Sequence, residues 1–279
     1  KGAATALKAR ILLHVASPLF ADRTVNTLAC NQFDGDRAAT YRAAREAAVK
    51  VINSGDYELL DCTGGINTER ANKWNKIIVT NNKEQIWVHP FGNLSGAEKN
   101  WIPLQHGPNG YHNWSGITPT QDLVMAFEFE DGTMPKGMTK PGDHQVGNPY
   151  NGREPRFYAT VGTDGNEWGR PRPADAKGLD PTPLGRLQCG YYEVSDGDAD
   201  ITLDLPTGEK VKFKGMNGID TRKGPIEDWN GSWTGYYERK LVDPTVDGQY
   251  YPQLVPWTYI RLAEMYLVAA EASVELNEL

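Results

Sequence analysis

The sequence has little cysteine: three in 279 residues, at Cys30, Cys62 and Cys189. No two of them form a C-x-x-C pair, so the spacing excludes a zinc ribbon, and an odd number of isolated cysteines excludes a disulfide framework. Two of the three could still form one disulfide, and the sequence does not indicate which two.

Long apolar runs and clusters of basic residues are also missing. No segment of about 20 consecutive apolar residues is present, so we expect no part of this chain to span a membrane. The formal net charge is −7, from 29 Lys and Arg against 36 Asp and Glu. Nucleic-acid binding requires clustered cations that displace the counterions of phosphates, and this charge balance excludes it. Phosphate-binding glycine motifs are absent too, so nucleotide chemistry has no support.

Glycine, proline and aromatic residues are abundant instead. The chain has 29 Gly, 18 Pro, 8 Trp and 13 Tyr. Gly and Pro fix turns and irregular backbone, whereas Trp and Tyr supply large side chains with one polar edge. This combination predicts long structured loops that carry aromatic side chains at the surface.

Three segments have the apolar periodicity of helices: residues 3–16, 38–53 and 257–277. The first ends before Pro18, because a residue that precedes proline avoids the helical region, and the first two form a helical hairpin. The third presents mostly small side chains, which let a second helix approach closely. The predicted inward faces are Ala4, Leu7, Ile11 and Val15 in the first helix, Tyr41, Ala44, Ala48, Val51 and Ile52 in the second, and Ile260, Ala263, Leu267, Ala270 and Val274 in the third.

The region between the second and third helices is predicted to consist of loops and short strands. Residues 77–79 and 86–88 are candidate strands because they are short runs of β-branched and other apolar residues. Residues 200–205 and 210–214 alternate with period two and predict a hairpin. Two prolines predict a rigid surface loop at residues 171–175.

Five charged residues are interpreted as structural. Three of them, Arg261, Glu264 and Glu271, lie on an otherwise apolar predicted helix, where ion pairs between stacked helices explain them better than a functional role does. Arg153 and Arg156 are expected to anchor the loop layer.

Short motifs of one family follow one another along the chain. The C-terminal motif reads W-T-Y-I-R-L-A-E-M-Y-L-V-A-A-E-A at residues 257–272, and T-G-Y-Y-E-R-K stands at residues 234–240. Together with further segments, they resemble the SusD/RagB family, the glycan-binding outer-membrane lipoproteins of Bacteroidota. Met125 and Glu154 depart from the family pattern, because Asp is usual at both positions. The further segments are residues 6–20, 44–59, 83–87, 119–128 and 153–157.

The resemblance implies a mainly α fold: tetratricopeptide-like helical hairpins with a loop-rich inserted subdomain that contains short β-hairpins. Residues 1–60 and 257–279 would form the helical scaffold and residues of about 61–256 the subdomain, within a single C-terminal region of the family that spans residues 1–279. The family's N-terminal repeats and closing helices would lie outside this chain. The apolar helix faces would then either pack on each other or leave the isolated chain poorly soluble or self-associating.

The function that the resemblance implies is non-catalytic binding of an oligosaccharide or polysaccharide at the cell surface. The glycan would be delivered to a SusC-like TonB-dependent transporter in the outer membrane. The protein would face outward and be held by a lipid anchor outside this chain. A glycoside hydrolase or other carbohydrate-active enzyme is the first alternative, and a peptide-binding or structural member of the same family is the second.

The loop at residues 100–115 is the best candidate for a ligand-binding site. A flat indole can cover the apolar face of a sugar ring, while polar side chains bind the hydroxyl groups around its rim. We expect Trp114 and Trp101, ahead of Tyr111, to stack on sugar rings, with Asn113 and His112 beside them. The alternative for each aromatic residue is packing in a local core beneath the loops.

Three further tryptophans, Trp74, Trp168 and Trp229, are weaker candidates for ligand contact. Trp229 lies in an aromatic cluster next to the family motif at residues 234–240, and we expect that cluster to pack against the protein.

Catalytic and metal sites have weaker support. Glu128 and Glu130 are neighbours on one segment, whereas glycoside hydrolysis requires two opposed carboxyl groups. His106 and His112 share a loop, but their spacing matches no established metal site. No cofactor is expected, with one alternative: the D-x-D-x-D pattern of a calcium loop, which lacks the required glycine and glutamate and is better explained as a turn. Its residues are Asp196, Asp198 and Asp200.

Overall fold

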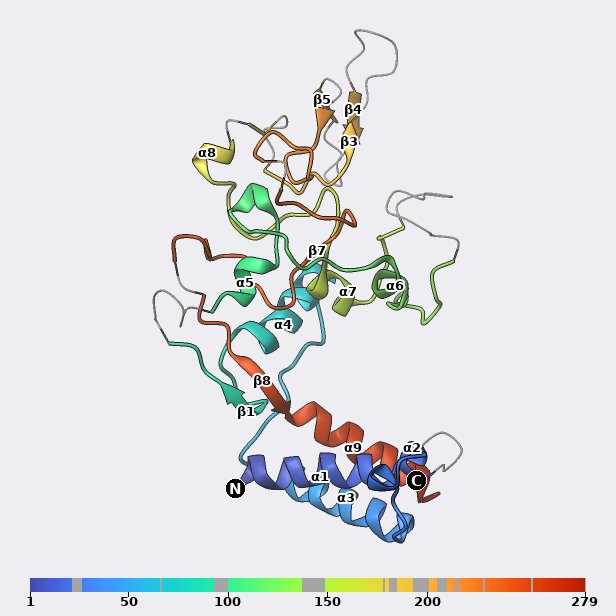
Figure 1. Ribbon diagram of the computed structural model, residues 1–279. Coiled ribbons are helices and arrows are strands. Elements are labelled where there is room, and N and C mark those ends of the chain that lie inside the picture. Colours follow the sequence, from blue (N-terminus) through green and yellow to red (C-terminus); the bar gives the residue numbers. More distant parts are fainter. Residues whose placement is uncertain are drawn as a thin grey trace. The chain divides into compact units, whose positions relative to one another are not determined.

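The chain forms two compact units in the computed structural model (Figure 1). The first, here called the helical unit, comprises Lys1–Asp61, Asn81–Pro90 and Pro256–Leu279; the second, the loop-rich unit, comprises Cys62–Thr80 and Phe91–Val255. Helix outweighs strand and the strand pairs are short, which confirms the predicted fold class. The described residues are 1–21, 27–65, 67–92, 100–136, 149–177, 179–180, 185–192, 201–204, 210–213, 216–227, 229–251 and 253–278.

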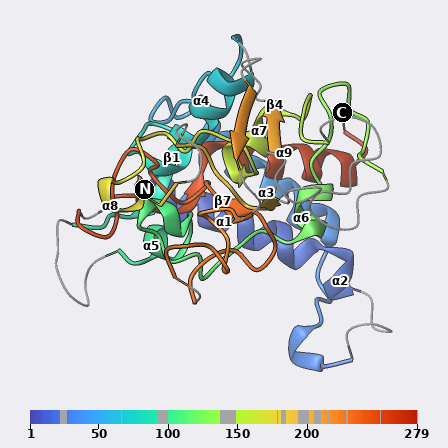
Figure 2. The ribbon, with the colours of Figure 1, turned by 90° about the horizontal axis from the view of Figure 1, so that it is seen from above.

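Three helices form the core of the helical unit: α1 (Gly2–Ala16), α3 (Arg37–Ile52) and α9 (Leu262–Glu275). They run side by side in both ribbon views (Figures 1 and 2). Two short elements, α2 (Pro18–Ala21) and η1 (Ala29–Asn31), lie in the connection between α1 and α3. The predicted α1–α3 hairpin is confirmed, and α3 buries Tyr41 and Val51 as predicted. Since α9 packs on α3 and α1, the apolar helix faces do cover one another.

The buried face of α1 differs from the predicted one. It consists of Ala6, Ala9, Leu13 and Ala16, whereas Ile11 is 51% exposed. Apolar residues occur on several sides of this helix, so periodicity alone could not identify the inward side. The alanine face is buried because small side chains allow α3 and α9 to approach closely.

The predicted C-terminal helix begins later than expected, because its first residues form strand β8 (Trp257–Arg261). This strand pairs antiparallel with β1 (Gln85–His89), which confirms the strand predicted at residues 86–88. Helix α9 then buries Leu262, Met265, Val268 and Ala272, while Leu267 and Val274 are 68% and 59% exposed. Ile260 is buried as predicted, but from β8. The rest of the predicted face was wrong, because the five residues before Leu262 do not continue the helical period.

Ion pairs stabilise the helical unit as predicted. Arg10 Nε lies 2.5 Å from Glu264 Oε1, joining α1 to α9. Arg261 at the end of β8 pairs with Glu84, a carboxylate that is almost completely buried beside β1. Residues 81–90 belong to the helical unit through these contacts, whereas the sequence had placed them in the loop-rich part.

Short helices pack together in the loop-rich unit. Helix α4 (Asn67–Val79) packs against α7 (Pro155–Thr160). The strand predicted at residues 77–79 is wrong, because these residues form the last turn of α4 and bury Ile77 and Val79. Short runs of apolar residues fit a strand and a buried helix end equally well. Thr120 caps the N-terminus of helix α6 (Gln121–Met125), because its hydroxyl accepts a hydrogen bond from the Leu123 amide.

Among the described residues, three two-stranded sheets complete this unit. The hairpin predicted from alternation is confirmed over β4 (Ile201–Asp204) and β5 (Lys210–Phe213), which pair with Ile201 opposite Phe213. The other pairs are β2 (Val161–Gly162) with β7 (Tyr237–Glu238) and β3 (Tyr191–Tyr192) with β6 (Met216–Asn217).

Arg153 anchors the loops of this unit as predicted. It is fully buried and donates hydrogen bonds to the carbonyls of Pro149 and Val124 at 3.0 and 3.1 Å. Arg156 instead forms an exposed ion pair with its neighbour Glu154.

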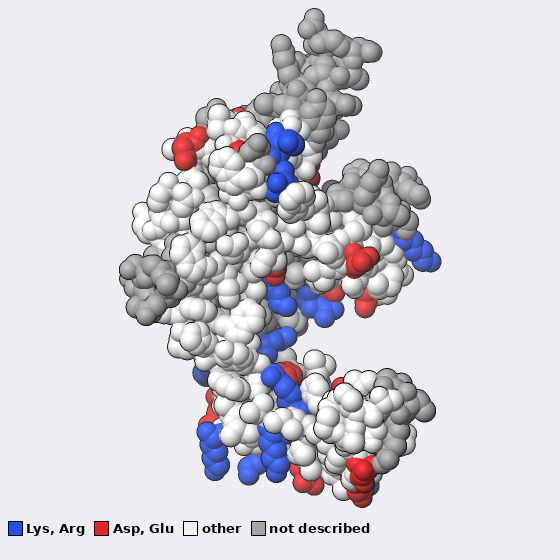
Figure 3. Space-filling model, in the orientation of Figure 1, with Lys and Arg blue, Asp and Glu red and all other residues white. Residues whose placement is uncertain are grey.

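Charged side chains are unevenly distributed on the face shown in Figure 3. They gather over the helical unit with both signs represented, whereas charges on the loop-rich unit are fewer and scattered. Among the helices of the described residues, none has the length and apolar character needed to cross a membrane.

Candidate functional site

The loop at residues 100–115 folds back on itself around two short helices, α5 (Ile102–Gln105) and η3 (Asn109–Tyr111). The Trp114 amide donates to the Leu104 carbonyl at 2.8 Å, and the Asn113 side chain donates to the Pro103 carbonyl at 3.0 Å. This return brings the rings of Trp101 and Trp114 to a centroid distance of 5.5 Å. Both indoles remain more than a third exposed.

Two residues of this loop have left-handed backbone conformations that residues other than glycine rarely adopt. They are His112, with φ of 60°, and Ser115, with φ of 54°. Such conformations cost free energy and persist where surrounding contacts impose them, often at functional sites. Here the buried Ser115 hydroxyl donates to the Gly107 carbonyl at 3.0 Å and holds the turn that presents Trp114.

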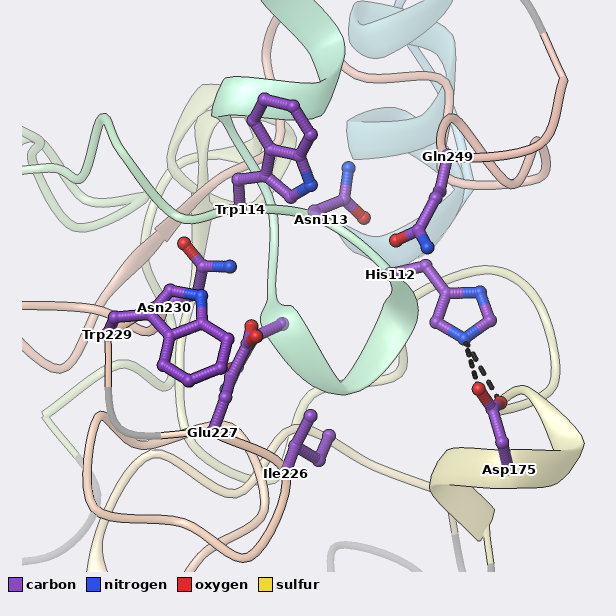
Figure 4. Close-up of a pocket in the computed structure, with 10 residues that line it drawn as sticks. His112, Asn113, Trp114, Asp175, Ile226, Glu227, Trp229, Asn230 and Gln249 are labelled. Carbon is purple, nitrogen blue, oxygen red and sulfur yellow. Dashed lines mark hydrogen bonds and ion pairs between the residues drawn. The ribbon is translucent and has the colours of Figure 1, made fainter.

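A pocket of about 610 Å³ lies beside this turn (Figure 4). It has two indole side chains, Trp114 from the 100–115 loop and Trp229 from the loop that follows β6. Between and around them are amide side chains, one imidazole and two carboxylates. The lining consists of Asn109, His112, Asn113, Trp114, Asp175, Ile226, Glu227, Trp229, Asn230 and Gln249.

A glycine shapes the second wall of the pocket. Gly231 follows Asn230 with φ of 121°, and a Cβ at that position would lie 2.7 Å from the Arg222 backbone nitrogen. Only glycine permits this close passage. The Arg222 guanidinium in turn donates to the Trp229 carbonyl at 2.7 Å. The backbone of the Trp229 segment is therefore fixed by two contacts with Arg222, this hydrogen bond and the close passage at Gly231.

His112 joins two other segments at the edge of the pocket. Its Nδ1 lies 2.6 Å from Asp247 Oδ2, and its Nε2 lies 3.0 Å from Asp175 Oδ1 on α8 (Ala174–Lys177). Only the protonated imidazolium can donate to both carboxylates. Burial opposes ionisation of Asp175, but the hydrogen bonds from His112 and from the Ala176 amide, with the charge attraction of His112, together outweigh it and lower the pKa of that carboxyl.

Tyr111 does not line the pocket. This corrects its assignment as a residue that stacks on sugar rings. It is completely buried, with the Arg172 guanidinium carbon 4.5 Å from its ring centroid, and its hydroxyl donates to the Gly185 carbonyl. Burial raises the pKa of Tyr111 to about 12. This tyrosine therefore supports the loop from beneath.

A buried ion pair below the loop was not predicted. Arg172 Nη2 lies 3.0 Å from Asp220 Oδ2, and both side chains are almost completely buried. Asp220 also accepts from the Gly110 amide at 3.1 Å, and Arg172 donates to the Gly110 carbonyl at 3.1 Å. Arg172 lies between two prolines that predicted a surface loop, and nothing in its local sequence indicates a buried partner 48 positions away.

The structure separates the other predicted aromatic residues. Trp101 is exposed and lies against Trp114 without lining the pocket. Trp168 is buried in the core with Tyr111, so it does not offer a face to a ligand, and Trp74 is half-buried on α4. Trp229, which we expected to pack against the protein, is 67% exposed and lines the pocket. The aromatic and amide composition of its segment, the same signal that identified the 100–115 loop, could have indicated this role.

The other lining residues, including Glu227 and Gln249, were missed. They come from loops far apart in the sequence, and no motif links them. His112, Asn113 and Trp114 are the predicted residues that the pocket does bring together.

The alternatives for catalysis and metal binding find little in the described residues. Glu130 pairs with Arg70 and does not line the pocket. His106 is buried, and burial lowers its pKa to about 4. In the part of the chain that the structure describes, no three His, Cys, Asp or Glu side chains come together as a metal site. Cys30 and Cys189 are free thiols. The calcium alternative at Asp196, Asp198 and Asp200 lies outside the described residues.

Comparison with known proteins gives one match. The SusD family profile matches residues 83–279, which include β1, the whole pocket and α9. No curated protein and no solved structure matches the chain.

Proposed function

The chain belongs to the SusD family, and on that premise we propose that its loop-rich unit binds an oligosaccharide in the pocket lined by Trp114 and Trp229, without cleaving it. The family is one of cell-surface proteins that bind glycans in nutrient uptake. The observation that carries the assignment to this pocket is that two exposed indoles and four amide side chains line one cavity.

The chemistry of this lining suits a sugar. The C–H face of a pyranose ring is apolar and covers an indole, while its hydroxyl groups exchange hydrogen bonds with amides. Asn109 adds a specific signal: its side-chain nitrogen is buried and has no hydrogen-bond partner among the residues that the structure describes. An acceptor oxygen of a bound sugar could satisfy it, because an unmade buried hydrogen bond is costly.

Binding without cleavage is supported by the state of Asp175. A glycosidase needs a carboxylic acid with a raised pKa to protonate the leaving oxygen, whereas the hydrogen bond from His112 lowers the pKa of Asp175. An assay of reducing ends with a polysaccharide panel tests this point. Sustained turnover above a heat-inactivated control would favour the hydrolase alternative.

Delivery to a SusC-like TonB-dependent transporter, and an outward-facing, lipid-anchored place in the outer membrane, are part of the same proposal. They are supported by family membership alone. Co-purification of a transporter with the native protein would test the partnership.

Substitution of the two indoles tests the pocket directly. Trp114→Ala and Trp229→Ala should each cost about 2 kcal/mol of binding free energy, roughly thirtyfold in affinity, because each removes a stacking surface. Isothermal calorimetry with the glycan that binds best in a panel screen measures this loss. Trp101→Ala should cost less, since Trp101 acts only by supporting Trp114.

Trp87→Ala is the matched control, because this indole on β1 in the helical unit is 42% exposed and does not line the pocket. It should bind normally. If both pocket variants remain folded and bind as tightly as the control, the pocket is not the glycan site. Capture of peptides instead of glycans would support the peptide-binding alternative.

A further inference from the structure

The lining of the pocket is biased in charge. It has two carboxylates, Asp175 and Glu227, and among the described residues it has no Lys or Arg. In the lining that the structure describes, His112 is the only side chain that could carry a positive charge, and two carboxylates leave this lining negative whether His112 is protonated or neutral. Figure 4 shows Glu227 extending from the segment that also carries Trp229, and both side chains line the pocket.

The arginines close to this site are already engaged. Arg170 donates to the Tyr111 carbonyl and lies 3.4 Å from Asp247. Arg172 is buried in its ion pair with Asp220. Arg172 cannot turn to an anionic ligand without leaving the buried carboxylate of Asp220 unpaired, which costs several kcal/mol. Arg170 is held by its hydrogen bond to the Tyr111 carbonyl and by its ion pair with Asp247.

Arg222 is held in a similar way. Its guanidinium carbon lies 3.6 Å from the centroid of the Trp233 ring, and one nitrogen donates to the Trp229 carbonyl. This arginine therefore holds the backbone behind the pocket and does not line it.

A carboxylate in a sugar-binding site favours ligands with adjacent hydroxyl groups over anionic ligands. Its two oxygens accept hydrogen bonds from two adjacent hydroxyl groups, and charge makes these bonds stronger than neutral ones. The same carboxylate repels a uronate, sulfate or phosphate group on the ligand, which is how a site rejects a wrong partner. On the basis of the proposed function, we propose that this pocket selects uncharged glycans with adjacent free hydroxyl groups and rejects anionic ones.

The first test is a screen of the intact protein by affinity electrophoresis. Neutral polysaccharides (a galactomannan, a xyloglucan, a mixed-linkage β-glucan) are compared with anionic ones (polygalacturonate, alginate, a sulfated galactan). We expect retardation by a neutral polysaccharide that is lost in Trp114→Ala. Trp114-dependent retardation by an anionic polysaccharide would overturn the charge selection and leave the proposed function standing. Binding to none of them, or binding that ignores both pocket tryptophans, would overturn the proposed function and this inference with it.

The second test isolates charge. The neutral polysaccharide that binds is oxidised at its primary hydroxyls to the corresponding uronate, and the affinities of the two forms are compared. The wild-type protein should bind the neutral form at least about tenfold more tightly. The ratio should shrink in 0.5 M NaCl, because salt screens repulsion between exposed charges. It should also shrink in Glu227→Gln, which removes the charge but keeps the shape.

Glu46→Gln is the control, since Glu46 is an exposed carboxylate on α3 in the helical unit. The ratio of its affinities for the neutral and the oxidised polysaccharide should equal that of the wild type. A wild-type ratio near one would overturn the proposal. A large ratio that neither salt nor Glu227→Gln changes would overturn it too, because the loss would then come from the missing hydroxyl group.

Discussion

Arg172 and Asp220 form the most consequential pair of residues beneath the site. Their contact holds Gly110 from both its amide and its carbonyl, and the Tyr111 ring packs under the guanidinium. The position of the 100–115 loop therefore depends on two side chains that never contact ligand space.

Removal of one partner should be costly. Asp220→Ala leaves the Arg172 guanidinium buried beside an empty space, and we expect the free energy of unfolding to fall by about 3–5 kcal/mol. Urea unfolding followed by tryptophan fluorescence measures the change. The matched comparison is Glu167→Ala, which removes an exposed Arg–carboxylate pair with Arg186 and should cost less than about 1 kcal/mol. Equal losses in the two variants would contradict a special role for the buried pair.

His106 makes the stability of the loop-rich unit depend on pH. Burial lowers its pKa to about 4 from an ordinary value of 6.5, so between these values the unfolded chain binds more protons than the folded chain. Stability should therefore rise with pH across this window and fall on acidification, by about 3 kcal/mol in total, since each pKa unit corresponds to about 1.4 kcal/mol.

A neutral substitution isolates this contribution. His106→Gln should flatten the dependence between pH 6.5 and 4 when unfolding free energies are measured at a series of pH values. Burial raises the pKa of the neighbouring Glu238, which acts in the opposite direction, so the difference between wild type and variant is the quantity to compare. Parallel curves would show that His106 is not held neutral.

For individual residues, the sequence predicted three side chains that line the pocket, but it did not predict the direction of every side chain in the loop. Trp114, Asn113 and His112 line the pocket as expected from their composition. Tyr111, one position before His112, is completely buried. The direction of a side chain in an irregular loop depends on partners such as Arg172, which lies far away in the sequence.

The face of α1 that packs against α3 and α9 is built from small side chains. Ala9 is fully buried there, whereas Ile11 is half exposed. Ala9→Leu should destabilise the protein by about 1–3 kcal/mol, because the extra carbons force the helices apart. Ile11→Ala should change stability by less than about 0.5 kcal/mol. Circular dichroism during urea unfolding measures both. The reverse order would show that the periodicity-based face is the packed one.

Helices and strands with a regular period of apolar residues could be predicted from the sequence. The point at which a strand changes into a helix could not. Helix α3 and the β4–β5 hairpin follow directly from their periods of apolar residues. The change from strand β8 to helix α9 at Leu262 was missed, because residues 257–261 extend only in response to β1. No local propensity contains that information.

All the residues that line the pocket belong to the loop-rich unit. A bound glycan should therefore stabilise that unit by about 2.7 kcal/mol when its concentration is a hundred times its dissociation constant. Differential scanning calorimetry should show a loop-rich transition that moves to higher temperature with ligand. The transition of the helical unit should stay in place. A shift of the helical transition alone would place the binding site elsewhere.

The pairing of β1 with β8 and of α1 with α9 has a consequence for synthesis. Arg10 and Glu264, which join α1 to α9, are 254 positions apart. At the usual rates of translation, α1 and α3 leave the ribosome roughly ten seconds or more before α9 exists to cover them. During that interval the part of the α1–α3 hairpin that α9 later covers is available to chaperones or to another nascent copy. A premature stop before residue 256 should therefore yield a chain whose first helices lack part of their core, even though the loop-rich segment is complete.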